Sequence, residues 1–185
     1  MSRRPGSIRP VPLVIAVVRR DEIGDDLWRR VVALCDRAFD EDMETILADL
    51  IDSTHVLAEF EGVLAGHACW VTRWLSADYR PPLRTAYIEA VATDPNLQRR
   101  GIGGATMKRV GREIRTYELG GLCPNYPEFY ARFGWETWRG PLAIRTHDGL
   151  LETPDEHVMI LRTPLTPRID LDARLTAEWR PGEVW

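Results

Sequence analysis

The chain has 185 residues, of which 44% are hydrophobic and 28% charged, a balance typical of one soluble domain built around one core. Its net charge of −4 does not indicate a nucleic-acid partner. No apolar run approaches the ~20 residues of a membrane span, so we expect no membrane partner. The three cysteines and four histidines form neither a CxxC pair nor an HExxH motif, so we expect no metal site.

The first residues differ in composition from the rest. Residues 1–10 are rich in arginine and proline and predict a flexible arm, whereas residues 11–185 predict a single domain. The apolar run over residues 13–18 imitates a short signal peptide, but it ends at two arginines without a small-residue cleavage site. We therefore expect a buried first strand over residues 11–20 and a cytoplasmic location.

The first half of the domain predicts two helices and three strands. Apolar residues recur at helical spacing over residues 25–39, with Asp25 as the expected N-cap, and residues 41–52 predict a second, acidic helix. Two strands follow over residues 55–62 and 63–76. The next strand, LRTAYIEAVAT, is apolar on both faces, which predicts a central position in the sheet.

The second half predicts a helix over residues 101–118, a strand over 119–124, a short helix over 128–135 with Gly134 as its C-cap, and strands over 142–146 and 157–163. The tail over residues 174–185 is unusual because it carries tryptophans to its last residue. No internal repeat or interdomain linker is found. Together the elements predict an α/β fold in which a mixed sheet is flanked by helices.

The stretch QRRGIG lies between the predicted central strand and the following helix. The first N–H groups of a helix lack partners within the helix, and this end carries partial positive charge. Glycines would let a phosphate approach these groups closely, and adjacent arginines would add charge. The expected phosphate or pyrophosphate site comprises Gln98, Arg99, Arg100, Gly101, Gly103 and Gly104. The alternative is a solvated arginine-rich turn, and neither the GxxxxGK[ST] nor the GxGxxG pattern is present.

This motif resembles the Q/R-x-x-G-x-G/A signature of the GNAT superfamily of acetyl-CoA-dependent N-acyltransferases. The resemblance covers about residues 85–146, because AYIEAVAT is similar to the central strand of the family and FYARFGW to its later helix. It implies a single-domain GNAT fold, acetyl-CoA as co-substrate, and the coenzyme A pyrophosphate at the glycine–arginine loop. It also implies that the backbone of Val91 and Thr93 contacts the pantetheine arm.

Within the superfamily, the chain resembles the aminoglycoside 2′-N-acetyltransferases. The similar segments are YIEAVAT, FYARFGWETWRGP, TPDEHVMIL and above all the terminal WRPGEVW, in register over about residues 38–185. The resemblance implies acetylation of the 2′-amine of a cationic amino sugar, and hence antibiotic resistance. Glutamates stand at positions 156 and 183 where aspartates are usual. This departure points to a divergent branch, for which kasugamycin is an alternative to the common 2′-amino aminoglycosides.

The resemblance also implies roles for individual residues. Glu89 would accept the proton of the amine through ordered water, and Tyr130 would protonate the departing thiolate. The N–H group of Val91 is the natural donor to the developing oxyanion. The acidic positions that the resemblance implies hold the ammonium and hydroxyl groups of the substrate are Asp42, Glu156, Glu183 and the terminal carboxylate of Trp185. We expect Glu44 and Glu89 to add to this negative charge.

Other interpretations of these residues remain open. Glu89 could be a solvent-facing or salt-bridged strand residue, and Tyr130 a core aromatic of a short helix. Asp42 and Glu44 could merely solvate the second helix, and the tail could be a frayed terminus. Cys123 invites a covalent acyl-enzyme, but no histidine or acid partner can be assigned to it, so we predict a buried structural thiol.

Two other functions remain open. The first is a GNAT enzyme for another amine, such as a metabolite, a polyamine or a protein terminus. The second is a non-catalytic acetyl-CoA-binding module that senses or regulates, which would need the QRRGIG site but neither Glu89 nor Tyr130. Dimers are common among GNAT proteins, so a homodimer is also open, although the sequence indicates no interface.

Overall fold

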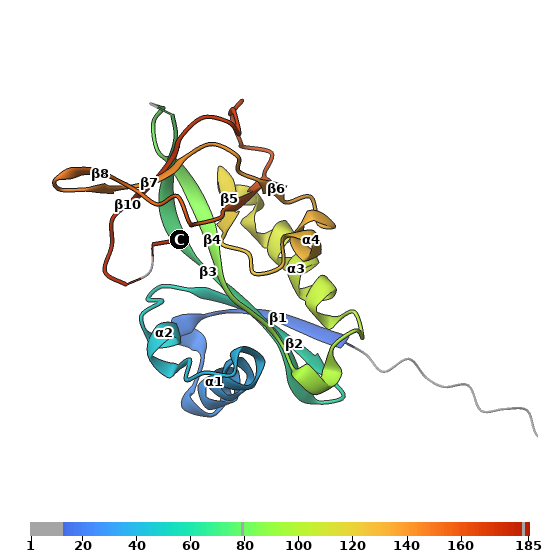
Figure 1. Cartoon of the computed structure of the whole chain (residues 1–185). Coiled ribbons are helices and arrows are strands. Elements are labelled where there is room, and N and C mark those ends of the chain that lie inside the picture. Colours follow the sequence, from blue (N-terminus) through green and yellow to red (C-terminus); the bar gives the residue numbers. More distant parts are fainter. Residues whose placement is uncertain (1–12, 79, 183) are drawn as a thin grey trace, which may run out of the picture.

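The computed structural model describes residues 13–78, 80–182 and 184–185, so the predicted arm over residues 1–10 and the predicted substrate residue Glu183 lie outside the described part of the chain. Within those ranges, one ten-stranded sheet is flanked by helices (Figure 1). The sheet mixes parallel and antiparallel neighbours. The predicted α/β class with a mixed sheet is therefore confirmed.

The strands of the sheet are β1 (Leu13–Arg19), β2 (Thr54–Phe60), β3 (Val63–Ala77), β4 (Leu83–Thr93), β5 (Leu119–Leu122), β6 (Glu136–Thr137), β7 (Leu142–Thr146), β8 (Gly149–Glu152), β9 (Met159–Arg162) and β10 (Leu175–Glu178). Their spatial order is β6-β9-β5-β4-β3-β10-β7-β8, while β2 pairs with β3 and β1 with β2. Most neighbours are antiparallel, but β4 runs parallel to β5 and β10 runs parallel to β7.

The antiparallel pair β3–β4 forms the centre of the sheet and crosses the middle of the molecule in Figure 1. The strand β3 is long enough to pair with β2 near its start and with β10 near its end. Its side chains alternate between two cores: Cys69 and Leu75 join one hydrophobic cluster, and Ala68 and Trp70 join another. Because both faces of this strand are covered, most of its residues are buried.

The helices are α1 (Asp25–Phe39), α2 (Glu44–Ala48), α3 (Ile102–Glu113) and α4 (Pro127–Ala131), with 3₁₀ turns at Arg20–Glu22, Pro95–Leu97 and Ile114–Thr116. The apolar sides of α1 and α2 join the cluster that contains Leu75, whereas α3 and α4 join the cluster that contains Trp70. The two helix pairs therefore cover opposite faces of the β3–β4 pair. None of the helices in the described ranges is long and apolar enough to cross a membrane.

Four details of the predicted elements are wrong. Gly134 is not the C-cap of the short helix α4, because that helix ends at Ala131 and Arg132 is its C-cap. Gly24, not Asp25, is the N-cap of α1, because Gly24 is still extended while Asp25 is already helical. The helix α2 is much shorter than residues 41–52, because the chain turns on both sides of it, with left-handed backbone at Asp40 and Asp52. The strand β1 is half-buried rather than buried, because it pairs with β2 alone among the described strands.

Candidate functional site

The strands β4 and β5 lie side by side only over a short stretch. Residues 85–87 of β4 pair with residues 119–121 of β5, after which β4 continues to Thr93 without a strand partner on this edge among the described residues. The N–H and C=O groups of an unpaired edge can bind an extended ligand as if it were an added strand. The predicted backbone contacts of Val91 and Thr93 fall in this open stretch.

The open stretch of β4 contains a bulge next to Glu89. The register with β3 jumps between His67 and Cys69, so that two residues of β4, Ala90 and Val91, oppose one residue of β3. Ala90 has a φ of 48°, in the left-handed region that residues other than glycine rarely adopt. A strained backbone position therefore lies directly between the predicted base and the predicted oxyanion donor.

The loop after β4 leads into the first turn of α3. Gly101 has a φ of 82°, and no side chain caps the helix, so its first N–H groups lack a side-chain acceptor. A Cβ atom on Gly103 would lie 2.9 Å from the Oγ1 atom of Thr93, so glycine allows the helix to meet the end of β4 closely. Arg99 and Arg100 are exposed beside this turn. The arrangement fits the phosphate groups that the motif predicts.

The helix α4 and the turn after it place aromatic side chains beside the first turn of α3. A Cβ atom on Gly104 would lie 3.3 Å from the Cζ atom of Phe133, and the rings of Phe129 and Tyr130 meet edge to face at 5.0 Å. Burial, with a smaller contribution from Cys123, raises the pKa of Tyr130 to about 12. The Tyr130 hydroxyl therefore keeps its proton at neutral pH, as a donor must.

Glu89 belongs to an ion pair within the sheet. Its carboxylate accepts a hydrogen bond from the guanidinium of Arg73 on β3, and the side chains are 24% and 7% exposed respectively. Arg73 also donates to the carbonyl oxygen of Val184 at 2.5 Å and lies 4.0 Å from the centre of the Tyr87 ring. The salt-bridged alternative for Glu89 is therefore present, and the carboxylate still keeps the partial exposure that a proton acceptor needs.

Arg73 was not a predicted site residue. It links the central-strand glutamate to the end of the chain through partners that lie 16 and 111 positions away in sequence. No local pattern marks an arginine in a strand as such a link, because the contacts depend on how β3, β4 and the tail come together. Arg73 is the residue of this candidate site that the sequence indicated least.

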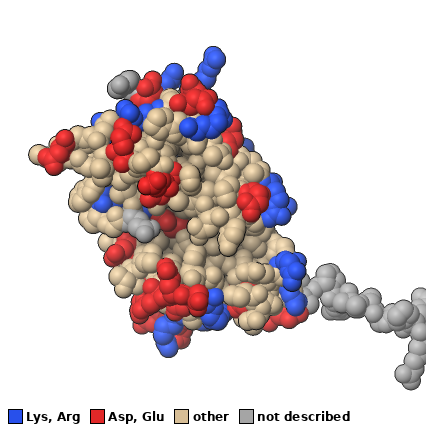
Figure 2. Space-filling view, viewed as in Figure 1, with Lys and Arg blue, Asp and Glu red and all other residues tan. Residues whose placement is uncertain are grey.

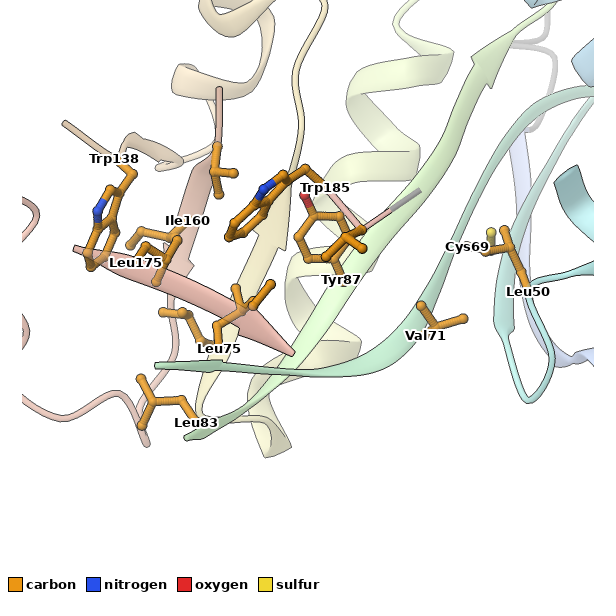
Figure 3. Packing of buried hydrophobic residues seen from close by; sticks show 14 of the residues in the cluster. Leu50, Cys69, Val71, Leu75, Leu83, Tyr87, Trp138, Ile160, Leu175 and Trp185 are labelled. Atoms are coloured by element: carbon orange, nitrogen blue, oxygen red, sulfur yellow. The ribbon is translucent and has the colours of Figure 1, made fainter. Parts of the chain in front are cut away.

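The last residues of the chain dock against the sheet. Val184 and Trp185 are each 7% exposed, and they belong to the same core cluster as Tyr87 (Figure 3). The Nε1–H group of Trp185 donates to the Oγ1 atom of Thr153 at 2.9 Å. The alternative of a frayed terminus is thereby excluded for these two residues, whereas contact between the terminal carboxylate and a substrate stays a prediction.

Tyr87 lies among the charged groups of this face. Its pKa is raised well above the usual value, mainly by burial, and its charged or ionisable neighbours are Arg73, Glu89, Cys123 and Glu156. Its hydroxyl is buried and has no hydrogen-bond partner among the described residues. An unsatisfied hydroxyl is costly, so it is available to a bound ligand or water. Tyr87 of β4 is thus a common neighbour of the predicted residues Glu89 and Glu156.

Cys123 contradicts the prediction of a buried structural thiol. It is exposed, because β5 ends at Leu122 and the next residue begins a loop. Its thiol donates to the Oε2 atom of Glu156 at 3.8 Å. Partial burial of the thiol, together with the Glu156 carboxylate, raises the pKa of Cys123. A thiol held in its protonated form is a poor nucleophile, so this arrangement does not favour a covalent acyl-enzyme.

A hollow of about 410 Å³ lies beside the docked tail. Its walls include Glu152, Glu156 and Thr153, the last of which is the hydrogen-bond partner of Trp185. Glu152 pairs with Arg174 at 2.7 Å, so Glu156 carries the less compensated charge. Figure 2 shows acidic side chains on this face both above and below its middle. Arg139 also lines the hollow, but its guanidinium pairs with Asp172 at 2.6 Å, so Glu156 leaves negative charge for a cationic ligand.

Asp42 and Glu44 lie on the helical layer of the same face. Asp42 is in the loop between α1 and α2, and Glu44 is the first residue of α2. Both are exposed, and the Oδ1 atom of Asp42 accepts the backbone N–H of Glu44 at 3.1 Å. In Figure 1 this layer lies below the C-terminus, on the side of the molecule that also carries the tail. Their contact with substrate stays a prediction.

A second hollow, of about 600 Å³, lies between α3, the turn after α4, and the end of β9 with the residues that follow it. It is basic, because Lys108, Arg115, Arg132 and Arg162 line it. Arg162 is compensated by Glu136 at 2.8 Å, whereas no salt bridge holds Lys108 or Arg115 among the described residues. This hollow is a positive surface on a chain of net negative charge.

Comparison with known proteins identifies the class. Residues 20–138 match the family described as acetyltransferase (GNAT) domain. The GNAT family N-acetyltransferase YhbS from Escherichia coli, solved in complex with CoA, has a TM-score of 0.64 at 17% identity, covering 97% of this chain and 94% of that one. Eis1 from Mycobacterium abscessus has a TM-score of 0.56 at 22% identity over 69% of this chain, which spans only 32% of that larger protein. At these identities the structures show a shared fold alone, but the family match places the chain among the GNAT N-acetyltransferases.

A curated relative narrows this class. The aminoglycoside 2′-N-acetyltransferase of Mycolicibacterium fortuitum is 34% identical over 139 residues, which are 71% of this chain and 70% of the relative. Within the GNAT enzymes, the chain belongs to the aminoglycoside 2′-N-acetyltransferase family. Both family resemblances and the single-domain GNAT fold are therefore confirmed.

Proposed function

We propose that this enzyme transfers the acetyl group of acetyl-CoA to the 2′-amine of an aminoglycoside antibiotic, and that the cell thereby becomes resistant to the drug. The observation that carries the proposal is the link made by Arg73. It connects Glu89, beside the open edge of β4, to Val184 in the docked tail. The tail holds the most family-specific sequence of the chain, so the linkage joins the acceptor-specific part to the expected base. The specificity named for the relative supports the 2′ position.

The donor site is proposed along the open edge of β4 and the first turn of α3. The backbone of Val91 and Thr93 would hold the pantetheine arm as an added strand. The pyrophosphate would lie at the helix N-terminus, held by Gln98, Arg99, Arg100, Gly101, Gly103 and Gly104. The cations of the basic hollow would supply further counter-charge. Bound there, acetyl-CoA supplies an activated acetyl thioester.

Three groups of this chain would serve the transfer. An ammonium has no lone pair, so Glu89, held by Arg73, would accept the proton of the amine directly or through one water. The N–H group of Val91 would donate to the acetyl oxygen as negative charge develops on it. The Tyr130 hydroxyl, with a pKa of about 12, would donate to the sulfur as the carbon–sulfur bond breaks. The new carbon–nitrogen bond then leaves an uncharged amide on the sugar.

Recognition of the acceptor would rest on carboxylates. A polycationic sugar is held by several negative groups on one wall, and their arrangement decides which amine faces the thioester. The proposed contacts are Asp42, Glu44, Glu89, Glu156, Glu183 and the terminal carboxylate of Trp185. Both kasugamycin and the common 2′-amino aminoglycosides carry the required amine.

Release of free thiol from acetyl-CoA tests the proposal directly. The acceptors to compare are kasugamycin, gentamicin, tobramycin, kanamycin, amikacin and spermidine. Kanamycin and amikacin carry a 2′-hydroxyl in place of the amine and serve as internal controls. We expect turnover with 2′-amino compounds only, and the product spectrum should place the acetyl group on that nitrogen.

The outcomes separate the competing functions. Turnover with spermidine but not with the antibiotics would replace the proposal by an enzyme for another amine. Binding of acetyl-CoA without turnover, unaffected by Glu89→Gln, would indicate a regulatory module. Resistance is tested separately, by expressing the wild type and Glu89→Gln in a sensitive host and comparing the inhibitory concentrations of each accepted drug.

A further inference from the structure

A buried chain of polar side chains lies behind the bulge of β4, and the proposed mechanism does not use it. Ser53, His55 and His67 are 1%, 0% and 0% exposed. The Oγ atom of Ser53 lies 2.8 Å from His55 Nε2, and His55 Nδ1 lies 2.9 Å from His67 Nε2. The other ring nitrogen of His67, Nδ1, lies 2.7 Å from the carbonyl oxygen of Ala90. This series of hydrogen-bonded side chains therefore ends at the backbone of the bulge.

The direction of these hydrogen bonds follows from the last acceptor. A carbonyl oxygen cannot donate, so His67 Nδ1 carries a proton and donates it to Ala90. His67 Nε2 then accepts from His55 Nδ1–H, and His55 Nε2 accepts from the Ser53 hydroxyl. Every ring nitrogen is satisfied while both imidazoles are neutral. Burial keeps them so, because it lowers the pKa of His55 to about 3 and that of His67 to about 4.

The peptide unit that His67 holds is also the one that carries the expected oxyanion donor. The carbonyl of Ala90 and the N–H of Val91 belong to one planar trans peptide, in which the two groups point in opposite directions. Because the carbonyl points inward to His67, the N–H of Val91 points away from it. If this peptide rotated, the N–H group of Val91 would no longer point to the side opposite His67.

The bulge also decides which side chains of β4 reach each face. In a regular strand, residues two apart share a face, so Val91 and Thr93 would follow Glu89. Instead Val91 packs with the cluster of α3, and Thr93 lies close to Gly103 in the first turn of that helix. The extra residue at Ala90 thus lets one strand present Glu89 on one face and Thr93 on the other.

Ala90 needs support to stay in this conformation. Left-handed backbone is unfavourable for an alanine, and it persists only where the surrounding structure holds it. The hydrogen bond from His67 is such a contact, and it comes from a side chain whose other nitrogen is fixed by His55. The hydrogen bonds with His55 and Ser53 therefore enforce the tautomer of His67 that donates to Ala90.

We propose that His67 is a positioning residue of the acetyl-transfer site, whose Nδ1–H group holds the carbonyl of Ala90 in the bulge and so aims the N–H group of Val91 at the acetyl thioester. His55 and Ser53 fix its tautomer. The catalytic part of this inference rests on the proposed function, whereas its consequence for acetyl-CoA binding does not depend on the acceptor.

The same side chains have the composition of a metal site. Ligand atoms of His55, His67 and Cys69 all lie within 4.8 Å of one another. Their lone pairs are engaged, however, because that of His67 faces His55 and that of His55 faces Ser53. The structure thus favours hydrogen bonds between these side chains over a bound metal ion. A metal ion found in the purified protein would contradict this interpretation.

The experiment compares variants by calorimetric acetyl-CoA binding and by steady-state kinetics. His67→Leu removes the donor, and we expect acetyl-CoA to bind about 10-fold more weakly and kcat to fall about 10–100-fold. His67→Asn places an amide nitrogen where Nδ1 stood and should keep both values within about threefold of wild type. Thr85→Val is the matched control, because Thr85 is equally buried on β4 but lies away from the bulge, and its hydroxyl donates to the carbonyl oxygen of Leu83 at 3.0 Å. It should lose stability while keeping both values within about threefold.

A second substitution probes the strain itself. Glycine adopts a positive φ without a steric cost, so Ala90→Gly should restore part of the kcat and binding that His67→Leu loses. If His67→Leu fails to fold, His67→Gln replaces it, because its amide lies at the Nε2 position and does not reach Ala90.

Several results would overturn the assignment. They are wild-type binding and kcat in the His67→Leu or His67→Gln protein, equal losses in the Thr85→Val protein, failure of His67→Asn to retain binding, or one equivalent of zinc in the purified enzyme. If the wild type acetylates no aminoglycoside, the proposed function fails, but the binding comparison still decides the role of His67.

Discussion

The two faces of the β3–β4 pair are built in different ways. On the side of α3, the expected contacts come from backbone groups and glycines that follow one another in the chain, from the open edge of β4 through the first turn of the helix. On the side of α1 and the tail, the proposed acceptor site is made of side chains from distant positions, among them Arg73, Glu89, Glu156 and Trp185.

This difference has a consequence for specificity. A site made of backbone is set by local geometry, so it can serve the same donor in many related proteins. A site made of distant side chains can change its acceptor by substitutions at several independent places. The two faces should therefore respond differently to mutation, the first through donor affinity and the second through kcat and the KM of the antibiotic.

The largest effect is expected from Glu89→Gln, which removes the proposed proton acceptor. We expect kcat to fall about 10²–10⁴-fold while acetyl-CoA binding stays within about threefold. Glu59→Gln is the matched control, since Glu59 is also a strand glutamate in an ion pair, with Arg30 at 2.8 Å. Steady-state kinetics and calorimetry measure the two quantities, and an unchanged kcat would mean that another group is the base.

Tyr130→Phe should have the next largest effect, because it removes the proposed donor to the departing sulfur. The ring would still pack edge to face on Phe129, so folding and donor affinity should be preserved. We expect kcat to fall about 10–100-fold. A kcat equal to that of the wild type would support the alternative that Tyr130 is a packing residue only.

Deletion of residues 182–185 should weaken the acceptor face and spare the donor face. We expect the KM of the antibiotic to rise about 10-fold or more and acetyl-CoA affinity to stay within about threefold. Stability should fall by about 2–4 kcal/mol, because Val184 and Trp185 are buried. Trp185→Phe keeps the terminal carboxylate and is the milder control. An unchanged KM after deletion would contradict the role of the tail.

Gly103→Ala should act on the donor face alone. The added Cβ would meet the Oγ1 atom of Thr93 at 2.9 Å, so we expect acetyl-CoA to bind about 10-fold more weakly. Gly111→Ala lies on the same helix, where the Cβ would meet Leu161 at an ordinary 3.6 Å. This control should leave binding unchanged and stabilise the helix by about 0.5–1 kcal/mol. Equal effects of the two substitutions would remove the special role of the glycine turn.

The smallest effect at neutral pH concerns His55 and His67. Burial lowers their folded pKa values to about 3 and about 4, below the ~6.5 of the unfolded chain. The unfolded state therefore binds more protons in mild acid, so this stability is present above pH ~6.5 and is lost as the pH falls toward about 4. Denaturation at a series of pH values should show a loss of roughly 2 kcal/mol per histidine by pH ~5. In the His55→Leu protein, the free energy of unfolding should depend less steeply on pH. A slope equal to that of the wild type would contradict the assigned role of His55.

Strong local periodicity was enough to predict the central elements. The helix α1 covers the predicted residues 25–39, and β4 covers all of the predicted LRTAYIEAVAT strand. The short strands β6, β8 and β10 were not predicted. Each has at most four residues, and β10 is held by β3 and β7, which lie far away in sequence. A strand of that length has too few side chains to reveal a period, so only its partners define it.

The sequence by itself determined the family, the glycine–arginine turn and the acidic, tryptophan-rich tail, because these are encoded by residues that lie next to one another. Only the tertiary structure decided that Arg73 joins Glu89 to Val184, that Cys123 is exposed, and that His67 reaches the bulge. Those contacts cross strands whose register depends on the whole sheet. Spacing along a chain describes neighbours within one element, and it carries no record of which residue will stand opposite once the strands have paired.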